Sequence, residues 1–131
     1  MNNNLTVCEQ EFFKYLKKEF FLKAFEIKTK ISLKEICEQI KDINIAFDYN
    51  NELVKDIIID FVLYKKNQVV CGIEIVDEKE EKELTMGKNL LIDTLFKTME
   101  CEYFRVIDLN NLKEAAKIIK NKIIEKQNKT S

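Results

Sequence analysis

The sequence predicts an α+β domain in which a mixed sheet with a central β-hairpin is flanked by helices, in the order α-β-α-β-β-α-β-α. Two observations predict this class: helix-capping signals precede segments with helical periodicity, and a short polar turn separates two runs rich in β-branched residues. A chain of 131 residues with 46% apolar residues is the size of one domain and can bury a core. We therefore expect a single domain over residues 1–131, with short flexible tails at residues 1–5 and 126–131.

The first predicted helix begins after Thr6 and extends to about Phe21. Thr6 followed by Glu9 has the spacing of a capping box, in which each side chain satisfies a backbone N–H group at the helix start. The apolar faces of this helix are formed by Phe12, Phe13, Leu16 and Phe20. Apolar and charged residues then alternate from Phe25 to Lys30, which is the period of a half-buried strand.

A second capping signal, Ser32 followed by Glu35, predicts a shorter helix through about Lys41. Two runs of strand-forming residues follow it. They are residues 56–64 (DIIIDFVLY) and residues 69–76 (VVCGIEIV). The polar turn at residues 65–68 separates the two runs, so they are expected to form an antiparallel hairpin centred on Asn67.

The remainder of the chain predicts a helix, a strand and a final helix. The helix is expected over residues 84–100 and the strand over residues 103–107, after which Asp108 or Asn110 can cap the final helix. In that helix, apolar residues recur at helical spacing at Leu112, Ala116, Ile119 and Ile123. The strand residues expected to be largely buried are Ile57, Ile59, Phe61, Ile73 and Ile75.

Composition excludes several classes of function. Because 22 basic and 23 acidic residues nearly cancel, no uniform field favours generic binding of polyanions. Gly72 and Gly87 are the only glycines, so the chain has no glycine-rich phosphate loop of the P-loop or Rossmann type. The start of the chain lacks the features of a signal peptide, and no stretch approaches the roughly 18 apolar residues that span a bilayer. We expect a cytoplasmic protein without membrane contact.

The cysteines do not predict a zinc site, because they form no CxxC pair and the chain has no histidine. They are Cys8, Cys37, Cys71 and Cys101. We expect these cysteines to be small buried hydrophobic residues in a reducing cytosol.

Asp60 and Glu74 lie within otherwise apolar strands, where an unpaired charge is costly. A hairpin centred on Asn67 places Asp60 directly opposite Glu74, and opposed residues of an antiparallel pair share a face. Two neighbouring carboxylates repel and raise one pKa unless a cation lies between them; Mg²⁺, a hard ion with oxygen ligands, is suited to that position. Alternatively, each acid faces solvent on the polar side of the sheet. The residues leave both interpretations open.

The order of helix, strand, hairpin with Asp60 and then Glu74, helix and strand resembles the restriction-endonuclease-like core of the PD-(D/E)XK nuclease superfamily. Within that superfamily, the chain is similar to a small bacterial family of unknown function that is often found beside topoisomerase-type C4 zinc fingers. The matching segments are residues 9–16 (EQEFFKYL), 25–33 (FEIKTKISL), 46–47 (AF), 60–63 (DFVL), 73–75 (IEI), 93–95 (DTL) and 104–106 (FRV). The resemblance implies that Asp60 and Glu74 bind Mg²⁺.

Several catalytic positions of the superfamily are altered here. Active members carry a lysine two residues after the glutamate, where it helps to position or activate the attacking water. This chain has Val76 at that position, and valine can neither bind a water nor stabilise developing charge. The small family usually carries a second acid at Val76, a histidine near Glu80, an acid at Asn89 and a lysine at Ile92. All four positions differ in this sequence.

Three further residues are candidates for the site. Asp77 is one residue out of register with the lost position, and Lys88 follows on the next helix. The Lys88 ammonium either reaches inward to replace the missing lysine or extends into water. Glu9 occupies the position of the first helix that often places an acid near the metal in the superfamily, but the capping box with Thr6 also explains it.

The resemblance implies a degenerate nuclease-like domain, catalytically weak or inactive, that acts as a nucleic-acid-binding or interaction module. Its catalytic positions would be Asp60, Glu74 and Lys88, and its Mg²⁺ ligands Asp60, Glu74 and Glu9. The alternatives are an active Mg²⁺-dependent nuclease that hydrolyses phosphodiester bonds, and an unrelated α+β protein-interaction domain. Lysines on the first and last helices either contact the phosphates of DNA or RNA or form solvated faces. These lysines are Lys14, Lys17, Lys18, Lys113, Lys117 and Lys120.

Overall fold

The computed structural model describes residues 5–21, 24–39, 56–76 and 83–130. The elements over these residues are α1 (Val7–Glu19), β1 (Glu26–Ser32), α2 (Leu33–Gln39), β2 (Ile58–Lys65), β3 (Gln68–Ile75), α4 (Glu83–Thr98), β4 (Glu102–Val106) and α5 (Leu112–Thr130). Their order is the expected one, and the α+β class is confirmed. Within the described ranges, no helix has the length and apolar character needed to cross a bilayer.

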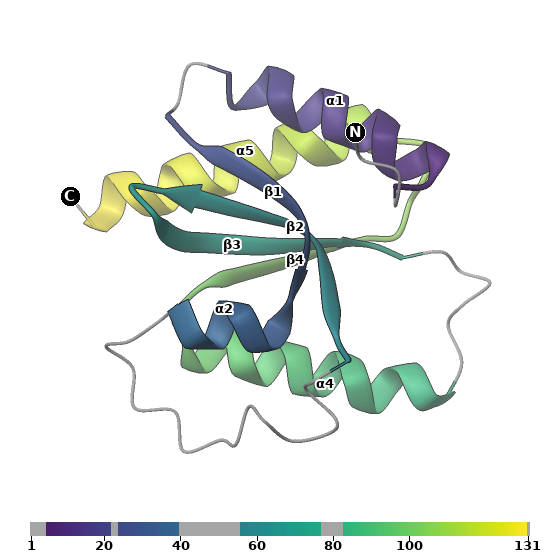
Figure 1. The fold of residues 1–131 in the computed structure, drawn as a ribbon. Coiled ribbons are helices and arrows are strands. Elements are labelled where there is room, and N and C mark those ends of the chain that lie inside the picture. Colours follow the sequence, from purple (N-terminus) through teal and green to yellow (C-terminus); the bar gives the residue numbers. More distant parts are fainter. Residues whose placement is uncertain (1–4, 22–23, 40–55, 77–82, 131) are drawn as a thin grey trace.

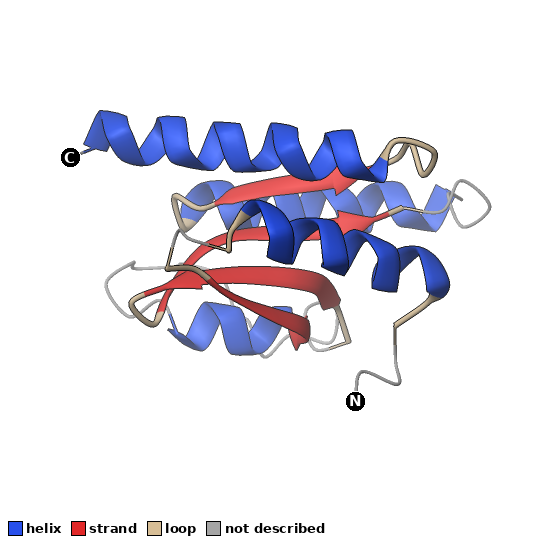
Figure 2. Cartoon of the chain, turned by 90° about the horizontal axis from the view of Figure 1, so that it is seen from above, coloured by secondary structure: helices blue, strands red, loops and turns tan. Residues whose placement is uncertain are grey.

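The sheet has four strands in the order β1-β2-β3-β4. β1, β2 and β3 are antiparallel neighbours, whereas β4 runs parallel to β3. A parallel neighbour requires a crossover connection, which contains α4. α1 and α5 cover one face of the sheet, and α2 and α4 cover the other (Figure 1). Figure 2 shows the strands (red) lying between helices (blue).

Each helical layer buries its own apolar core against the sheet. The α1/α5 core consists of buried Phe12, Leu16, Phe20, Phe61, Leu63, Cys71, Ile73, Val106, Leu112, Ala116, Ile119 and Ile123. The α2/α4 core consists of buried Leu33, Ile36, Cys37, Ile57, Ile59, Val62, Tyr64, Ile92, Leu95, Phe96 and Met99. Four of the five strand residues expected to be largely buried are in these cores, but Ile75 is only partly buried against the α1/α5 core. Of the cysteines, Cys37 and Cys71 are buried as expected, whereas Cys8 and Cys101 are only partly buried.

The two predicted capping signals form as expected. Thr6 Oγ1 accepts a hydrogen bond from Glu9 N at 3.1 Å, and Thr6 N donates to Glu9 Oε1 at 2.9 Å. Ser32 Oγ accepts from Glu35 N at 3.1 Å at the start of α2. α2 is described to Gln39, and the expected extension to residue 41 lies outside the described residues.

The ends of α5 differ from the prediction. Neither Asp108 nor Asn110 is the residue that caps it, because the first helical bond runs from Ala115 N to the carbonyl of Asn111. Asp108 instead closes the turn before the helix by accepting from Asn110 N at 3.1 Å and from Asn111 Nδ2 at 2.6 Å. At the other end, α5 extends through Thr130, so residues 126–130 are helical rather than a tail.

The hairpin between β2 and β3 has a tighter turn than expected. Lys65 pairs with Gln68, so the connection is the two residues Lys66 and Asn67, which have φ of 53° and 64°. Positive φ at both positions is the conformation of a type I′ turn, whose twist matches that of the strands. By itself, this turn would place Asp60 opposite Ile73.

A β-bulge restores the register that the sequence predicts. The pairing shifts between Leu63 and Tyr64, and beyond the shift Phe61 pairs with Ile73. The additional residue is Val70, which packs against the α1/α5 core together with its neighbour Cys71. The next position in this register places Asp60 opposite Glu74, so the bulge aligns the two acids.

A second irregularity lies where β1 and β2 pass the same point of the sheet. Ile59 belongs to the α2/α4 core but Phe61, two residues later, belongs to the α1/α5 core, so the alternation of faces breaks at Asp60. In β1, Ile27 packs against the α1/α5 core and Ile31 against the α2/α4 core. Lys30, with φ of 54°, is the residue at which this strand changes face. Both breaks fall at adjacent positions of the paired strands.

Phe61 anchors the α1/α5 core, because it is fully buried and its ring lies 5.4 Å from that of Phe12 and 5.8 Å from that of Phe13. Replacing Phe61 with alanine is expected to lower the free energy of unfolding by about 3–5 kcal/mol. Urea denaturation measures this change. The matched control is Phe21→Ala, since Phe21 is 80% exposed; it should change stability by less than about 0.5 kcal/mol. Equal effects of the two substitutions would contradict this description of the core.

Candidate functional site

An ion-pair cluster lies at the point where β1 and β2 change face. Lys30 Nζ is 2.7 Å from Asp60 Oδ1 and 2.9 Å from Glu9 Oε2. Asp60 Oδ2 accepts a hydrogen bond from Ile75 N at 2.9 Å, while Glu9 Oε1 accepts from Thr6 N at 2.9 Å. All four oxygens of the two carboxylates therefore have donors from the protein. We call Lys30, Glu9 and Asp60 the lysine cluster.

Burial makes this cluster energetically important. The side chains of Glu9 and Asp60 are only 8% and 12% exposed, whereas that of Lys30 is 26% exposed. Two buried carboxylates without a counter-charge would repel each other and would also lose hydration. The Lys30 ammonium offsets both costs, and it joins β1 to β2 and to α1.

The Lys30 backbone has an unusual conformation for a lysine within a strand. Its φ of 54° lies in the left-handed region, which costs a residue with a Cβ about 1 kcal/mol or more. This conformation coincides with the change of face in β1. The strain is thus located at the residue whose side chain reaches both acids.

Burial and ion pairing act in opposite directions on the lysine cluster. Burial lowers the pKa of Lys30, but its hydrogen bonds to Asp60 and Glu9 outweigh burial, so that the pKa is raised above its ordinary value. Burial raises the pKa of Asp60, and the Lys30 ammonium and the N–H group of Ile75 oppose this rise. Asp60 has two donors on its carboxylate, the arrangement of an ionised acid, and we therefore treat the cluster as charged near neutral pH.

Glu74 has a different set of neighbours. A Cβ on Gly72 would lie 2.6 Å from the Phe96 ring, so this side of β3 faces α4, and Glu74, two residues on, faces the same way. In the parallel pairing with β4, Gly72 aligns with Tyr103 and Glu74 with Arg105. Glu74 Oε1 and the Tyr103 hydroxyl are both buried, and neither makes a hydrogen bond of ordinary geometry within the described part of the chain. Tyr103 is nevertheless close enough to Glu74 to interact with its carboxyl group and to lower the pKa of Glu74.

The charge state of Glu74 is sensitive to these surroundings. Burial raises its pKa most, and the nearby Asp60 carboxylate raises it further, while Lys88, Tyr103 and Arg105 lower it. Burial and the Glu74 carboxylate likewise raise the pKa of Tyr103. An ionised Glu74 is thus less well compensated than either acid of the lysine cluster.

The structure places the predicted acids near one another but gives them different partners. The register aligns Asp60 with Glu74, and the charge of Asp60 acts on the pKa of Glu74. Asp60 is bound by groups of β1 and β3, and through Lys30 it is linked to Glu9 of α1. Glu74, in contrast, faces residues of β4 and α4. Glu9 completes the capping box, as one of its two interpretations predicted, and it also shares the Lys30 ammonium with Asp60.

The other predicted positions differ in their exposure to solvent. Lys88 is exposed, although its charge lowers the pKa of Glu74. Val76 and Asn89 are partly buried, and Ile92 is fully buried in the α2/α4 core. Two remaining candidates, Asp77 and Glu80, lie outside the described residues.

The described residues do not fit a divalent metal in the arrangement that the resemblance implies. A metal bound by Glu9, Asp60 and Glu74 needs their oxygens to converge, and no group of three such ligands does so over the described ranges. In addition, the Lys30 ammonium already lies between Glu9 and Asp60, where it would repel a second cation. Of these three acids, Glu74 alone has a buried oxygen without a hydrogen bond among the described residues.

Sequence reasoning missed Lys30, Tyr103 and Arg105. Lys30 was assigned to the polar side of the first strand, because it alternates with Phe25, Ile27 and Thr29. A signal was present: pairing of β1 with β2 brings Lys30 level with Asp60, and opposite charges across a strand pair attract. That register was not predictable from one strand alone.

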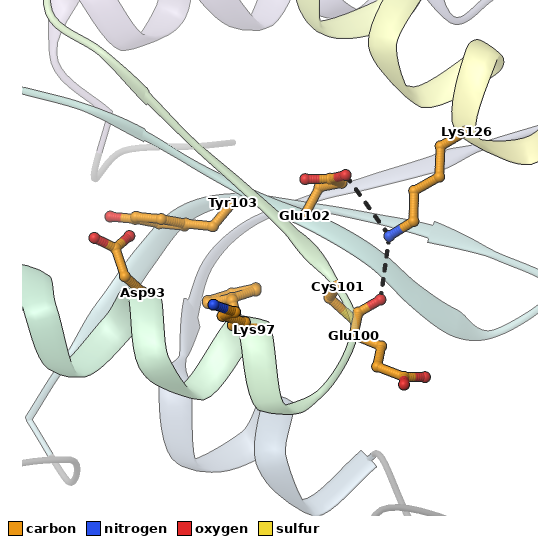
Figure 3. Close-up of a pocket in the computed structure, with 8 residues that line it drawn as sticks. Asp93, Lys97, Glu100, Cys101, Glu102, Tyr103 and Lys126 are labelled. Carbon is orange, nitrogen blue, oxygen red and sulfur yellow. Dashed lines mark hydrogen bonds and ion pairs between the residues drawn. The ribbon is translucent and has the colours of Figure 1, made fainter.

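A separate depression lies at the C-terminal end of α4 and encloses about 320 Å³ (Figure 3). Its lining includes Asp93, Lys97, Cys101 and Tyr103. Lys126 from α5 contacts Glu102 Oε1 at 3.8 Å and donates to the carbonyl of Glu100 at 3.2 Å. Side chains of both charges line this depression, and none of them belongs to the lysine cluster. The depression is therefore separate from the candidate site.

Comparison of the chain with protein-family models, with curated proteins and with solved structures finds no match.

Replacing Glu74 with glutamine should make stability less dependent on pH. Because folding raises the pKa of this carboxyl, wild-type protein loses stability as pH rises through the folded-state value. Glu74→Gln lacks this loss, so its free energy of unfolding should improve relative to wild type between about pH 4 and about pH 7, by about 1 kcal/mol. Urea denaturation across this range measures the difference.

The control is Glu11→Gln, a change of the same kind at an exposed position of α1. It should stay within about 0.5 kcal/mol of wild type at every pH. A Glu74→Gln variant that instead loses stability relative to wild type as pH rises would show that ionised Glu74 is well compensated.

Proposed function

We propose that this protein is a restriction-endonuclease-like domain that has lost phosphodiester hydrolysis, or retains it very weakly, and that now binds nucleic acid. The observation that carries the proposal is the Lys30 ammonium between Glu9 and Asp60, at 2.9 and 2.7 Å. Two of the three acids that the resemblance assigns to a metal, Glu9 and Asp60, instead share the Lys30 ammonium. The cluster thereby contributes to the fold rather than to hydrolysis.

The arrangement of the chain supports the nuclease-like part of the proposal. β1, β2 and β3 follow one another as antiparallel neighbours, and β4 joins β3 in parallel after α4. Asp60 lies on β2 and Glu74 on β3, opposite each other in register. This order of elements and acids is the one that the superfamily resemblance implies.

Two positions support the loss of hydrolysis. A nuclease site must lower the charge on a phosphodiester and position an attacking water. The Val76 side chain offers neither a proton nor a hydrogen bond, and Lys88 is exposed. Since the metal does not fit the described residues, we derive no metal-dependent step.

The helices α1 and α5 supply the basic groups for a contact with phosphates. In α5, residues 112–130 contain six lysines and two glutamates, although the whole chain is nearly neutral. Among the predicted lysines, Lys120 pairs with Glu19 at 3.0 Å and Lys17 lies over the Phe13 ring. The exposed lysines of the two helices include Lys14, Lys18, Lys113 and Lys117. Such a surface suits DNA or RNA through the phosphate backbone, with affinity that falls as salt rises.

The second candidate is an active Mg²⁺-dependent nuclease in which Lys88 replaces the missing lysine. One observation favours it: the charge of Lys88 reaches Glu74 and lowers its pKa. Under this alternative, substrate or metal binding would have to displace Lys30 from Asp60. An unrelated α+β protein-interaction domain is the third candidate, and the absence of salt-dependent nucleic-acid binding would favour it.

Purified protein with Mg²⁺ or Mn²⁺ is expected to cleave neither single- nor double-stranded DNA or RNA above the level of an Asp60→Asn, Glu74→Gln control. The physical reason is that the Lys30 ammonium lies between Glu9 and Asp60, and that Val76 stands where active members carry the lysine that touches the attacking water. A gel assay with end-labelled substrates measures cleavage. Fluorescence polarisation of the same substrates should show binding whose affinity falls steeply with salt.

Cleavage that disappears both in the Asp60→Asn, Glu74→Gln control and in Lys88→Ala would establish the active nuclease instead. Binding that is lost when Lys113 and Lys117 are both replaced by glutamate would locate the phosphate contact on α5. Neither Lys113 nor Lys117 belongs to the lysine cluster, so the two parts of the proposal fail separately.

A further inference from the structure

A phenylalanine side chain is exposed to solvent directly after the end of α1. Phe21 is 80% exposed, whereas the neighbouring Phe20 is 2% exposed. Among the aromatic residues that the structure describes, Phe21 alone is exposed, and the others are buried or partly buried. The Phe21 ring is therefore accessible to a planar partner.

The packing of Phe20 explains why Phe21 lies outside the core. The Phe20 N–H group donates to the carbonyl of Leu16 at 3.0 Å, and the Phe20 ring packs edge-on against Phe25 at 5.0 Å. Adjacent residues of a helix point in different directions, so burial of Phe20 turns Phe21 away from the core. Phe21 is thus attached to an anchored helix end.

Contacts between distant segments bring lysines to this end of the molecule. Lys120 of α5 pairs with Glu19 of α1 at 3.0 Å. Lys65, next to the turn between β2 and β3, lies 5.3 Å from the Phe25 ring and donates to Gln127 of α5 at 2.9 Å. Figure 1 shows the end of α1, the start of β1, this turn and the C-terminal half of α5 on the same side.

This end of the molecule carries an excess of positive charge. We call residues 17–21, 24–26, 65–66 and 120–127 the basic end. These residues contain seven lysines and three glutamates, although the whole chain is nearly neutral. Such a local excess attracts the phosphates of a nucleic acid.

We infer that the basic end binds single-stranded nucleic acid, with a base stacked on the Phe21 ring and with Lys17 and Lys18 against the phosphates. The inference rests on the proposed function and deepens it. It names the form of nucleic acid that is bound and the side chain that selects this form.

The chemistry of the Phe21 side chain favours a single strand over a duplex. A phenyl ring has no hydrogen-bonding group with which to read base edges, but it stacks on the face of any base. In a duplex these faces are covered by neighbouring bases, whereas bases of a single strand can be splayed out. Lysines beside an exposed aromatic ring are the combination that binds single strands without sequence preference.

An anionic membrane surface also attracts lysines and aromatic residues, but the packing of α1 does not suit it. A helix that lies in a membrane interface inserts a continuous apolar face. In α1 that face consists of Phe12, Leu16 and Phe20, and all three are buried in the α1/α5 core. Phe21 is left as one exposed ring among charged residues.

The test is fluorescence polarisation with a labelled single strand of about 20 nucleotides, longer than the roughly 4–16 nucleotides that one small domain covers, and with the duplex of the same sequence. Phe21→Ala should weaken binding to the single strand about tenfold, because one stacked base is lost. Binding to the duplex should change by less than about twofold. Phe21→Tyr retains an aromatic ring and should bind the single strand within about twofold of wild type.

The salt dependence of binding separates stacking from charge. Phe21→Ala should leave the slope of log Kd against log salt unchanged, because Phe21 contacts no phosphate. Lys18→Gln is the matched control at an exposed position of the same helix. It should reduce the slope by about 0.7, the value for one phosphate contact with a single strand.

The outcomes distinguish this inference from the proposed function. If wild type binds neither the single strand nor the duplex at low salt, both are overturned. If wild type binds nucleic acid but Phe21→Ala binds the single strand as well as wild type does, the inference is overturned and the proposed function stands. Vesicles containing phosphatidylserine test the membrane: loss of vesicle binding in Phe21→Ala with unchanged binding to the single strand also overturns the inference.

Discussion

The rest of the site depends on one constraint, which is that two buried acids share the Lys30 ammonium. Glu9 comes from α1 and Asp60 from β2, and Lys30 itself belongs to β1. Through its second oxygen, Asp60 also holds the backbone of β3 at Ile75. One cation thus joins a helix to three strands. Removing it would leave two uncompensated buried charges, which is among the costliest single changes to a folded protein.

The same contact explains the shape of the sheet. β1 and β2 exchange their inward-facing sides at Lys30 and Asp60, so that residues on either side of this point enter different cores. At the change of face, the Asp60 carboxylate accepts a hydrogen bond from the backbone N–H group of Ile75. A side chain thereby satisfies a donor of the sheet at an irregular position, as buried backbone groups require. The ion pairs of Lys30 and the change of face in β1 and β2 therefore occur at the same place in the sheet.

Much of the architecture was predictable from sequence because its signals are local. The capping box of Thr6 and Glu9 and the β-branched runs of the hairpin each depend on a few neighbouring residues. The alignment of Asp60 with Glu74 was predicted for an incomplete reason: the hairpin turn is two residues long, and the bulge at Val70 restores the register. Lys30 was missed because its role depends on a left-handed backbone and on the pairing of distant strands. Similarly, the surroundings of Glu74 depend on β4, which lies about thirty residues further along the chain.

The most direct test of the central claim is the coupling free energy between Lys30 and Asp60. A double-mutant cycle with Lys30→Met and Asp60→Asn, followed by urea denaturation, measures this quantity. The account predicts that each single change costs about 3–5 kcal/mol, and that the double variant is about 2–3 kcal/mol more stable than the sum of the single changes implies. The exposed pair Lys126 and Glu102, at 3.8 Å, serves as the control cycle, with an expected coupling below about 1 kcal/mol. Additive effects at Lys30 and Asp60 would contradict the account, because the ammonium would then not be what compensates the buried acid.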